Sequence, residues 1–261
     1  MEAVEPRVTE EMNAILTEDL TVDEIMSAVQ NMHPTKALGQ NSMPALFYQK
    51  FRNIIGNDII DLCFSVLNGH SQLSDINKTH LVLIPKLKEP CLISQFRPIS
   101  LCNVVYKIIA KVLANRLNII LPRCISNTQS AFVPGRLITD NALVAFEMFH
   151  TLKRKKKRKW GFYALKLDME KAYDRVEWPF LQAVMNRMGF HLKWINMIMR
   201  CITLVSCSIV INGCVSNSFQ PERGFRQGGP LSPYLFLICT KGLSALLFKH
   251  QRQGTLKGDS G

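Results

Sequence analysis

Helical periodicity dominates the pattern of apolar positions along the chain. Apolar residues recur three and four positions apart in several windows, as they do on the buried face of a helix. The spacing predicts helices over about 22–32, 45–51, 54–68, 104–121, 139–152, 178–188, 191–202 and 233–249. Thr21 and Glu24 form the T-x-x-E pattern of a capping box. Asn103 and Ser232 are candidate N-caps, and Pro122 is expected to end the helix that begins near residue 104.

A smaller share of the chain has the short apolar runs typical of strands. Leu81–Ile84 and Phe162–Leu167 are two such runs. Ser206–Ile211 and Cys214–Phe219 flank Asn212-Gly213, a strong short signal for a β-hairpin. The stretches 36–44, 89–98 and 254–261 have neither period and are expected to be loops or an unstructured tail. Together these elements predict an α+β fold.

Charge is divided unevenly along the chain, whose net charge is +12. Residues 1–30 hold eight acids and one base, a net charge of −7, which leaves 31 bases and 12 acids, or +19, for residues 31–261. An excess of this size favours a polyanionic partner, and nucleic acid before a membrane. The alternative is a solvated basic surface that serves solubility.

Seven consecutive bases form the most concentrated part of this charge. Such a run repels itself and is expected to be exposed. It is interpreted either as a nucleic-acid contact or nuclear import signal, or as a mobile solvated loop between a helix and a strand. The run consists of Lys153, Arg154, Lys155, Lys156, Lys157, Arg158 and Lys159.

Length and composition bound the class of protein. A chain of 261 residues with 47% hydrophobic and 20% charged residues is globular in composition and forms one large domain or two small ones. It has no uncharged apolar stretch long enough for a transmembrane helix, and the acidic segment Met1–Thr9 is not a secretory signal. The eight cysteines lack zinc-ligand spacing. We interpret them as buried apolar residues of an intracellular protein, nuclear or cytoplasmic.

Two acidic residues and one glycine-rich loop are candidate chemical sites. Asp168 is expected to end the apolar strand over 162–167, and Asp174 to open a helix six residues later. Rigid carboxylates at strand ends hold divalent metals in phosphoryl-transfer enzymes, although either Asp could instead be a turn former or an N-cap. The loop Arg223–Pro230 combines glycines, which let a ligand approach the backbone, with arginines, which suit phosphate. It lacks the GK[ST] of a P-loop.

Four segments of the sequence carry a more specific signal because of their order and spacing. They are FRPISL at Phe96–Leu101, QSAFVPGR at Gln129–Arg136, KLDMEKAYDRV at Lys166–Val176 and RQGGPLSP at Arg226–Pro233. From about residue 20 to its end, the chain closely resembles the reverse transcriptase of LINE-type (non-LTR) retrotransposons, most nearly the plant members. The resemblance implies a right-hand polymerase fold that copies RNA into DNA. Its partners would be an RNA template, a DNA primer and deoxynucleoside triphosphates, and its cofactor would be Mg²⁺ or Mn²⁺.

The resemblance also assigns roles to residues of the palm. Asp168 would be the first catalytic carboxylate and a metal ligand, assisted by the backbone carbonyl of Met169. Tyr173 would lie under the incoming sugar and exclude a 2′-hydroxyl group. Gln227 and Gly228 would touch the nascent base pair and the template.

Three basic residues are assigned to the fingers by the same resemblance. Arg97 and Arg136 would lie near the incoming triphosphate, to which a planar guanidinium group can donate two hydrogen bonds. Lys86 is a further finger residue that would contact nucleic acid.

The chain also departs from the family's pattern. It contains no Asp-Asp pair, so we expect it to end before the aromatic-x-Asp-Asp hairpin of the second metal site, with an incomplete palm and no thumb. Without that hairpin we expect an uncovered apolar face and marginal stability. Smaller departures are Lys36–Ser42 in place of KAPGPDG, Gly229 in place of an Asp, and Lys241 in place of a common acid.

The expected organisation follows from the resemblance and from these departures. It comprises an acidic amino-terminal segment over 1–20, fingers over 21–160, a partial palm over 161–250 and a disordered tail over 251–261. The sequence therefore predicts a reverse transcriptase domain fragment of a non-LTR retrotransposon that is inactive alone. Two alternatives stay open, namely a non-catalytic nucleic-acid-binding protein and a retroelement remnant without function.

Overall fold

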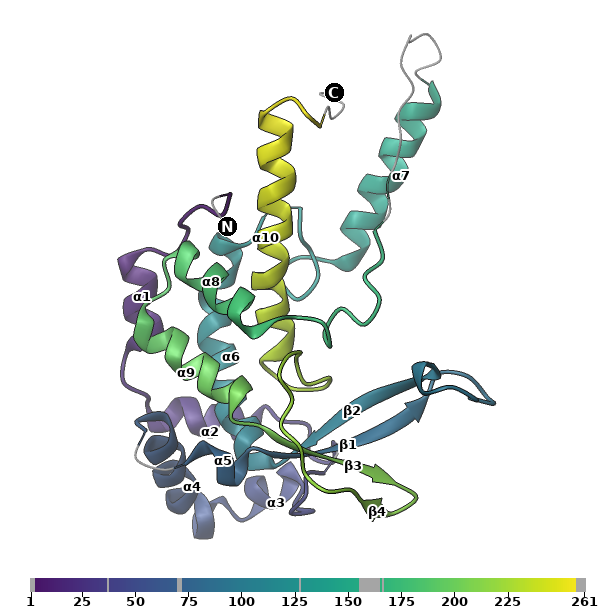
Figure 1. Cartoon of the computed structure of the whole chain (residues 1–261). Coiled ribbons are helices and arrows are strands. Elements are labelled where there is room, and N and C mark those ends of the chain that lie inside the picture. The colour runs from purple at the N-terminus through teal and green to yellow at the C-terminus, as the bar shows by residue number, and fades with distance from the viewer. Residues whose placement is uncertain are drawn as a thin grey trace.

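The computed structural model has a mixed α+β fold, and it describes residues 3–36, 38–69, 72–126, 128–154, 165 and 167–256 (Figure 1). The helices are α1 (Glu10–Thr17), α2 (Val22–Gln30), α3 (Ala45–Lys50), α4 (Arg52–Leu67), α5 (Leu73–Ile76), α6 (Val104–Cys124), α7 (Ile138–Arg154), α8 (Trp178–Met188), α9 (Leu192–Thr203) and α10 (Ser232–Arg252), with a 3-10 turn at Ile93–Gln95. The strands are β1 (Lys78–Pro85), β2 (Phe96–Cys102), β3 (Ser206–Ile211) and β4 (Cys214–Val215). The predicted α+β class is confirmed.

Helix α6 is the buried centre of the fold, and α1, α2, α4 and α10 pack around it. Its sequence is apolar on most of its circumference, as expected for a helix that is covered on several sides. The fully buried residues include Ile108, Ile109, Leu113, Leu117 and Leu121. Each such side chain contributes about 1.5–3 kcal/mol to stability on burial. Because helices from both halves of the sequence pack against α6, it joins them into one core.

The sheet combines both kinds of strand pairing in the order β2-β1-β3-β4. Strand β1 pairs antiparallel with β2 and parallel with β3, so that Leu81 lies opposite Ser100 on one side and Ile209 on the other. Strands β3 and β4 form the hairpin predicted at Asn212-Gly213. The sequence assigned residues 89–98 to a loop, but 96–98 belong to β2. Pro98 hid this strand from the sequence pattern, and its missing N–H is tolerated because β2 is an edge strand.

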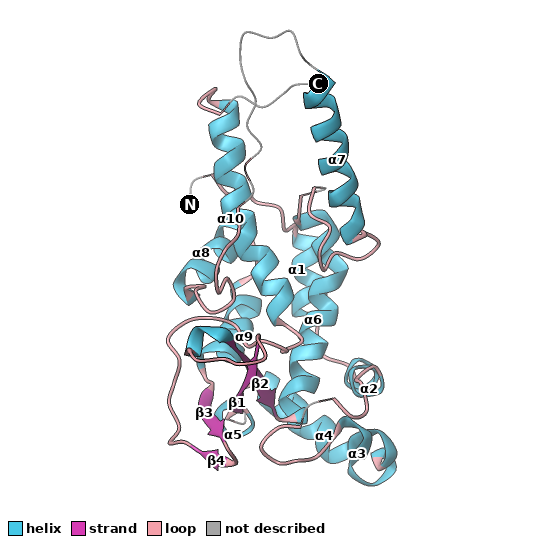
Figure 2. Ribbon diagram, turned by 90° about the vertical axis from the view of Figure 1, so that its right-hand side faces the viewer, coloured by secondary structure: helices cyan, strands magenta, loops and turns pink. Residues whose placement is uncertain are grey.

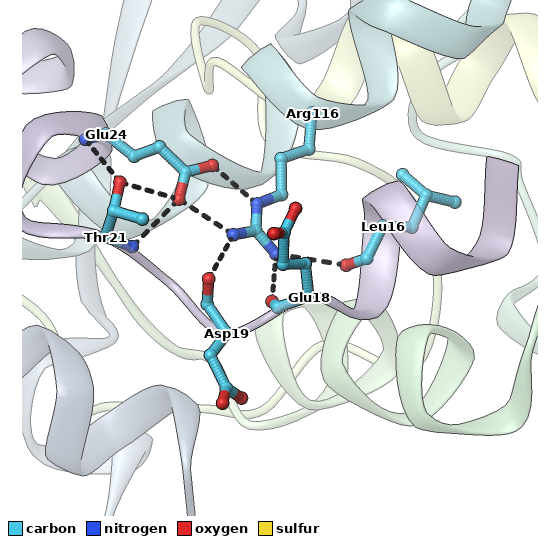
Figure 3. Close-up of polar contacts among 6 residues, drawn as sticks. All are labelled: Leu16, Glu18, Asp19, Thr21, Glu24 and Arg116. Carbon is cyan, nitrogen blue, oxygen red and sulfur yellow. Dashed lines mark hydrogen bonds and ion pairs between the residues drawn. The ribbon is translucent and has the colours of Figure 1, made fainter. Parts of the chain in front are cut away.

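The amino-terminal acidic segment is anchored to the core by Arg116 of α6 (Figure 3). The Arg116 side chain is only 5% exposed, and its guanidinium group donates to both carboxylate oxygens of Glu24, at 2.6 and 2.7 Å. Its remaining hydrogen bonds go to the backbone carbonyl groups of Leu16, Glu18 and Asp19. Helix α1 lies in this segment and is absent from the sequence-based prediction, since its eight residues give too short a window for a clear period.

The predicted helix ends are partly confirmed. The capping box of Thr21 and Glu24 is present. Asn103 has the N-cap position, but its side chain instead accepts from the Asn41 N–H and donates to the Ile76 carbonyl. The expectation that Pro122 ends its helix is wrong, because α6 continues to Cys124. A proline so close to the end removes only one intrahelical hydrogen bond.

The carboxyl-terminal helix also differs from its prediction. Ser232 is the first residue of α10 rather than its cap, since Leu231 has the N-cap position. The helix extends to Arg252, so the expectation of a disordered tail from residue 251 is wrong for the first two of its residues. Residues 257–261 lie outside the described part of the chain.

Helices α7 and α10 both extend away from the sheet end of the molecule (Figure 2). None of the α7 residues is buried, and Phe146 is 73% exposed. Among the cysteines, Cys91 and Cys214 are exposed and the other six are buried, as predicted for most of them. In the described part of the chain, none of the helices is both long and apolar enough to cross a bilayer.

Candidate functional site

The glycine-rich loop over 223–230 is fastened to the turn over 171–178, which precedes and begins α8. Three hydrogen bonds join them, from the Phe225 N–H to the Tyr173 carbonyl (2.9 Å), from the Gly224 N–H to the Val176 carbonyl (2.8 Å) and from the Trp178 Nε1–H to the Gly224 carbonyl (2.9 Å). The turn contains Asp174, so the predicted helix opening at this residue is wrong. Its carboxylate instead accepts a hydrogen bond from the Gln227 side chain at 3.1 Å. Two motifs some 50 residues apart therefore form one rigid unit.

Both arginines at the start of this loop have structural partners. Arg226 points inward, with its guanidinium group 3.8 Å from the centre of the Tyr106 ring. It donates hydrogen bonds to the side chains of Asn77 and Tyr106 and to the carbonyl of Cys201. Arg223 pairs with Glu177 at 3.1 Å. The interpretation of these arginines as phosphate ligands is therefore replaced by one in which they hold the loop in place.

A groove of about 790 Å³ opens beside this unit. Tyr173, Gln227 and Gly228 line it, and Gly228 has the left-handed φ of +95° that favours glycine. The Tyr173 ring stacks on Phe236 with centroids 4.9 Å apart and meets Phe225 edge-on, which fixes its orientation. Burial raises the pKa of the Tyr173 phenol and so favours its neutral form. The structure thus brings together three of the residues that the sequence assigned to nucleotide and template contact.

Four lysines give the groove its charge. They come from the segment after α2, from α6 and from the turn before α8, and are Lys36, Lys107, Lys111 and Lys171. None of the described residues that line the groove is an Asp or Glu. Burial lowers the pKa of the Lys107 ammonium group, and the charge of Lys36 acts in the same direction. A groove with several cations and aromatic residues in its lining suits a phosphate backbone with stacked bases.

These lysines are the functional candidates that sequence reasoning missed. Lys107 and Lys111 are four residues apart and so share one face of α6, which is a local signal that the sequence does contain. Lys36 and Lys171 carry no such signal, because only the tertiary fold places them beside α6. Lys171 has a left-handed φ of 52°, and its carbonyl accepts from the Asp174 N–H at 3.0 Å, which sets the direction of the turn.

Asp168 and Met169 lie on the other side of the same turn. They line a neighbouring, largely apolar hollow with Phe180, Phe236 and Leu243, and not the lysine groove. Most of the strand expected over 162–167 falls outside the described residues, but Leu165 and Leu167 are described, are exposed and are not in a strand. The Asp168 side chain is exposed as well. The predicted strand-end placement of this carboxylate is therefore not observed.

The residues present do not form a metal site around Asp168. Among the described residues, no three His, Cys, Asp or Glu side chains are grouped so as to hold a cation. Two other acids line the same hollow, but Glu170 is paired with Arg175 at 3.7 Å and Glu177 with Arg223 at 3.1 Å. Asp174 lines a different pocket, where its carboxylate accepts a hydrogen bond from Gln227. Asp168 alone cannot hold two divalent ions about 3.5–4 Å apart.

The predicted finger residues lie apart from the groove. Arg97 is exposed on β2 opposite Ile84, and the Lys86 ammonium group donates to the Ser94 carbonyl at 2.9 Å in the loop between β1 and β2. Arg136 donates to the carbonyl groups of Ser126 and Gln129, both at 2.6 Å, and of Pro122 at 3.4 Å. This residue thus stabilises the end of α6 and the chain that follows it.

The basic run is only partly described. Lys153 and Arg154 are exposed in the last turn of α7, a favourable position for cations. The other five bases lie outside the described residues, namely Lys155, Lys156, Lys157, Arg158 and Lys159. Their proposed contact with nucleic acid stays a prediction.

The chain is similar in sequence to a known protein family and to proteins of retrotransposons. The family model described as "Reverse transcriptase (RNA-dependent DNA polymerase)" matches residues 84–255. The chain is 30% identical over 244 residues to the transposon TX1 uncharacterized 149 kDa protein of Xenopus laevis, a match that covers 94% of this chain and 18% of that protein. It is 30% identical over 155 residues to the Pol polyprotein of the type-1 retrotransposable element R2 of Nasonia vitripennis, covering 59% of this chain and 15% of the relative.

A shorter match links the chain to a plant protein. It is 53% identical over 49 residues to the uncharacterized mitochondrial protein AtMg01250 of Arabidopsis thaliana, which covers 19% of this chain and 40% of that protein. The chain therefore spans less than a fifth of the TX1 and R2 proteins and less than half of the plant one.

Proposed function

Because the chain belongs to the reverse transcriptase (RNA-dependent DNA polymerase) family, we propose that its lysine groove binds an RNA template paired with a DNA primer. The retrotransposon relatives confirm the LINE-type (non-LTR) family that the four motifs indicated. The observation that carries the proposal is the groove itself, in which Tyr173, Gln227 and Gly228 meet four lysines.

The charge and shape of the groove support this binding mode. Lysine ammonium groups neutralise backbone phosphates without regard to sequence, as a polymerase that copies any template requires. The Tyr173 ring, held by Phe236 and Phe225, offers a rigid flat surface beside them. We assign it to the sugar of the incoming nucleotide, and Gln227 and Gly228 to the nascent base pair.

The fingers and palm of the right-hand polymerase fold can be assigned to two parts of this chain. We propose that residues 21–160 correspond to fingers and residues 161–250 to the palm. In this division the groove lies where the two parts meet, since α6 and the segment after α2 form one wall and the turn and loop form the other. Arg97, Lys86 and the basic run over 153–159 are then proposed as outlying contacts to the template or triphosphate.

Catalysis would require a site for divalent metal ions in addition to the groove. The family uses divalent metal ions, and Asp168 is the residue whose motif matches the first metal ligand. The described donors around it do not fit such a site. The observation favours the second candidate function, a domain that binds template and primer without polymerising in this arrangement.

Photocrosslinking tests the binding assignment directly. A template that carries 4-thiouridine opposite the primer end is irradiated with the protein, and the crosslinked peptides are mapped. We expect crosslinks to the segments 171–175 and 227–234. Crosslinks confined to the exposed surface of α4 and α9 would contradict the proposal.

Primer extension separates the two candidate functions. The chain is incubated with template–primer, nucleotides and Mg²⁺ or Mn²⁺, with Asp168→Asn as the matched control. We expect no incorporation that depends on Asp168. Extension by the parent chain that is abolished in Asp168→Asn would show that a complete metal site assembles in solution.

A further inference from the structure

A second basic cavity lies at the opposite end of α6 and α10 from the lysine groove. The groove is lined by the first half of α6 and the start of α10. This cavity, of about 660 Å³, is lined by the end of α6, by α10 from its middle to its end, and by the amino-terminal segment. From Lys107 to Arg123 the helix rises about 24 Å at 1.5 Å per residue. In Figures 1 and 2 this end of α10 lies beside the amino-terminal segment, away from the sheet.

The cavity concentrates positive charge. Its cationic residues are Arg7, Arg123, Lys241, Lys249 and Arg252, and among its described lining residues the one carboxylate is Glu5. The Glu5 carboxylate is shared by Arg7 at 3.3 Å and Arg252 at 3.2 Å. A net excess of cations therefore faces the same hollow.

Helix ends explain part of this charge but not Lys241. Arg123, Lys249 and Arg252 lie in the last turns of α6 and α10, where cations are favoured by the helix dipole. Lys241 is in the middle of α10 and half-buried, so the dipole gives no reason for a charge there. In the described part of the chain it has no hydrogen bond or ion pair. Burial lowers the pKa of its ammonium group, and the charge of Arg7 acts in the same direction, while the charge of Glu5 acts in the opposite one.

We propose that this cavity binds a backbone phosphate of the RNA strand, as a second contact beyond the groove. The proposal rests on the proposed binding of template. An anion that enters the cavity would give Lys241 the partner that it lacks and would relieve its repulsion with Arg7. Arg123 is exposed at the rim, where its guanidinium group can reach a phosphate with two donors. At about 3.4 Å per nucleotide, a stacked strand of about seven nucleotides spans the distance from the groove.

The test compares RNA affinity in two matched double variants of the full chain. Arg123→Gln/Lys241→Gln removes two charges at the cavity. Arg52→Gln/Lys50→Gln removes two exposed charges from α3 and α4, at the other end of the molecule (Figure 1). Fluorescence anisotropy with a labelled single-stranded RNA gives the dissociation constant at several salt concentrations. We expect the cavity variant to bind more weakly and its logarithmic salt slope to be shallower by about 0.7 for each phosphate that it no longer neutralises. The control should keep the slope of the parent.

Several results would overturn the inference. Equal affinities and slopes for the cavity variant and the parent would exclude a phosphate contact at the cavity, and so would equal losses in both double variants. A thermal shift by inorganic phosphate that the cavity variant abolishes, with RNA affinity unchanged, would assign the cavity to a small anion instead. Charge reversal at exposed Arg123 alone, by Arg123→Glu, provides a second variant that leaves the half-buried Lys241 in place. If the parent binds RNA with no salt dependence, the proposed function fails as well.

Discussion

Two arginines in the interior are held by different kinds of partner. Arg116 has the carboxylate of Glu24 and three backbone carbonyl groups, and it ties the acidic amino-terminal segment to α6. Arg226 donates to neutral acceptors and lies against the face of Tyr106, and it ties the glycine-rich loop to the core. Both residues therefore join segments that are distant in sequence through hydrogen bonds, a role that residue type alone does not reveal.

Replacing Arg116 should strongly destabilise the fold. Arg116→Met leaves the Glu24 carboxylate and the carbonyl acceptors without their donor, which costs about 3 kcal/mol, the lower end of the range for breaking a buried pair, since Glu24 is 32% exposed. Urea unfolding followed by circular dichroism measures the change. The exposed Arg187→Met is the matched control, expected within about 0.5 kcal/mol of the parent. Equal midpoints for the two variants would show that the Arg116 network adds nothing.

The same ion pair predicts a pH dependence of stability. The hydrogen bond from Arg116 lowers the pKa of the Glu24 carboxyl below its ordinary value of 4.5. Its contribution to stability is therefore fully present above about pH 4.5 and is lost as the pH falls through the lower pKa of the folded state. Thermal melts between neutral and acidic pH should show a steeper loss for the parent than for Glu24→Gln. Parallel curves for the two proteins would exclude this linkage.

At the scale of elements, the junction of β2 with α6 depends on a glycine in the loop after α2. A Cβ atom on Gly39 would lie 2.5 Å from the backbone of Cys102 and Asn103, which is too close for any side chain. This position lies in the stretch where the sequence departs from the family's KAPGPDG, yet it keeps that glycine. The close approach fixes the loop that carries Lys36 against the start of α6.

Two Gly→Ala substitutions should therefore have opposite effects. Gly39→Ala forces the loop away from Cys102 and Asn103, and we expect a loss of about 1–3 kcal/mol. Gly56→Ala, within α4 and with open space at its Cβ position, should raise stability by about 0.5–1 kcal/mol through helix propensity. Chemical denaturation of both variants checks the pair. A neutral Gly39→Ala would mean that the loop does not pack as closely as the structure indicates.

The elements that the sequence predicts well are those whose signal is local. The periods of α2, α6, α8 and α9 and the Asn-Gly turn lie within short windows, so their positions are correct to within a few residues. Strand β2 and the parallel pairing of β1 with β3 depend on partners far along the chain, which no window contains. The residues of the candidate site likewise divide into those with a local sequence signal and those that depend on distant partners. The positions of Tyr173 and Gln227 are recognised from their motifs. Lys36 and Lys171 lie in quoted segments too, but only the fold brings them beside the lysines of α6.

At the scale of the whole molecule, α6 and α10 join two clusters of basic residues. The lysine groove lies toward the start of these helices, and the second basic cavity lies toward their ends. The apolar hollow beside Asp168 lies against α8 and α10, with Phe180 and Leu243 each about 40% exposed. Such clusters are what the proposed binding of an extended nucleic-acid strand requires, and a uniform solubilising surface would not need them.

The salt dependence of template–primer binding tests the central claim most directly. The parent chain, the groove variant Lys36→Gln/Lys111→Gln/Lys171→Gln and the surface control Lys50→Gln/Arg52→Gln/Lys78→Gln are each titrated with a labelled RNA–DNA hybrid at several salt concentrations. If the groove holds the backbone, the logarithmic slope of the groove variant is shallower by about 0.7–0.9 for each phosphate that it no longer neutralises, and the control keeps the parent slope. Identical slopes for all three proteins would show that the groove is not the template–primer site.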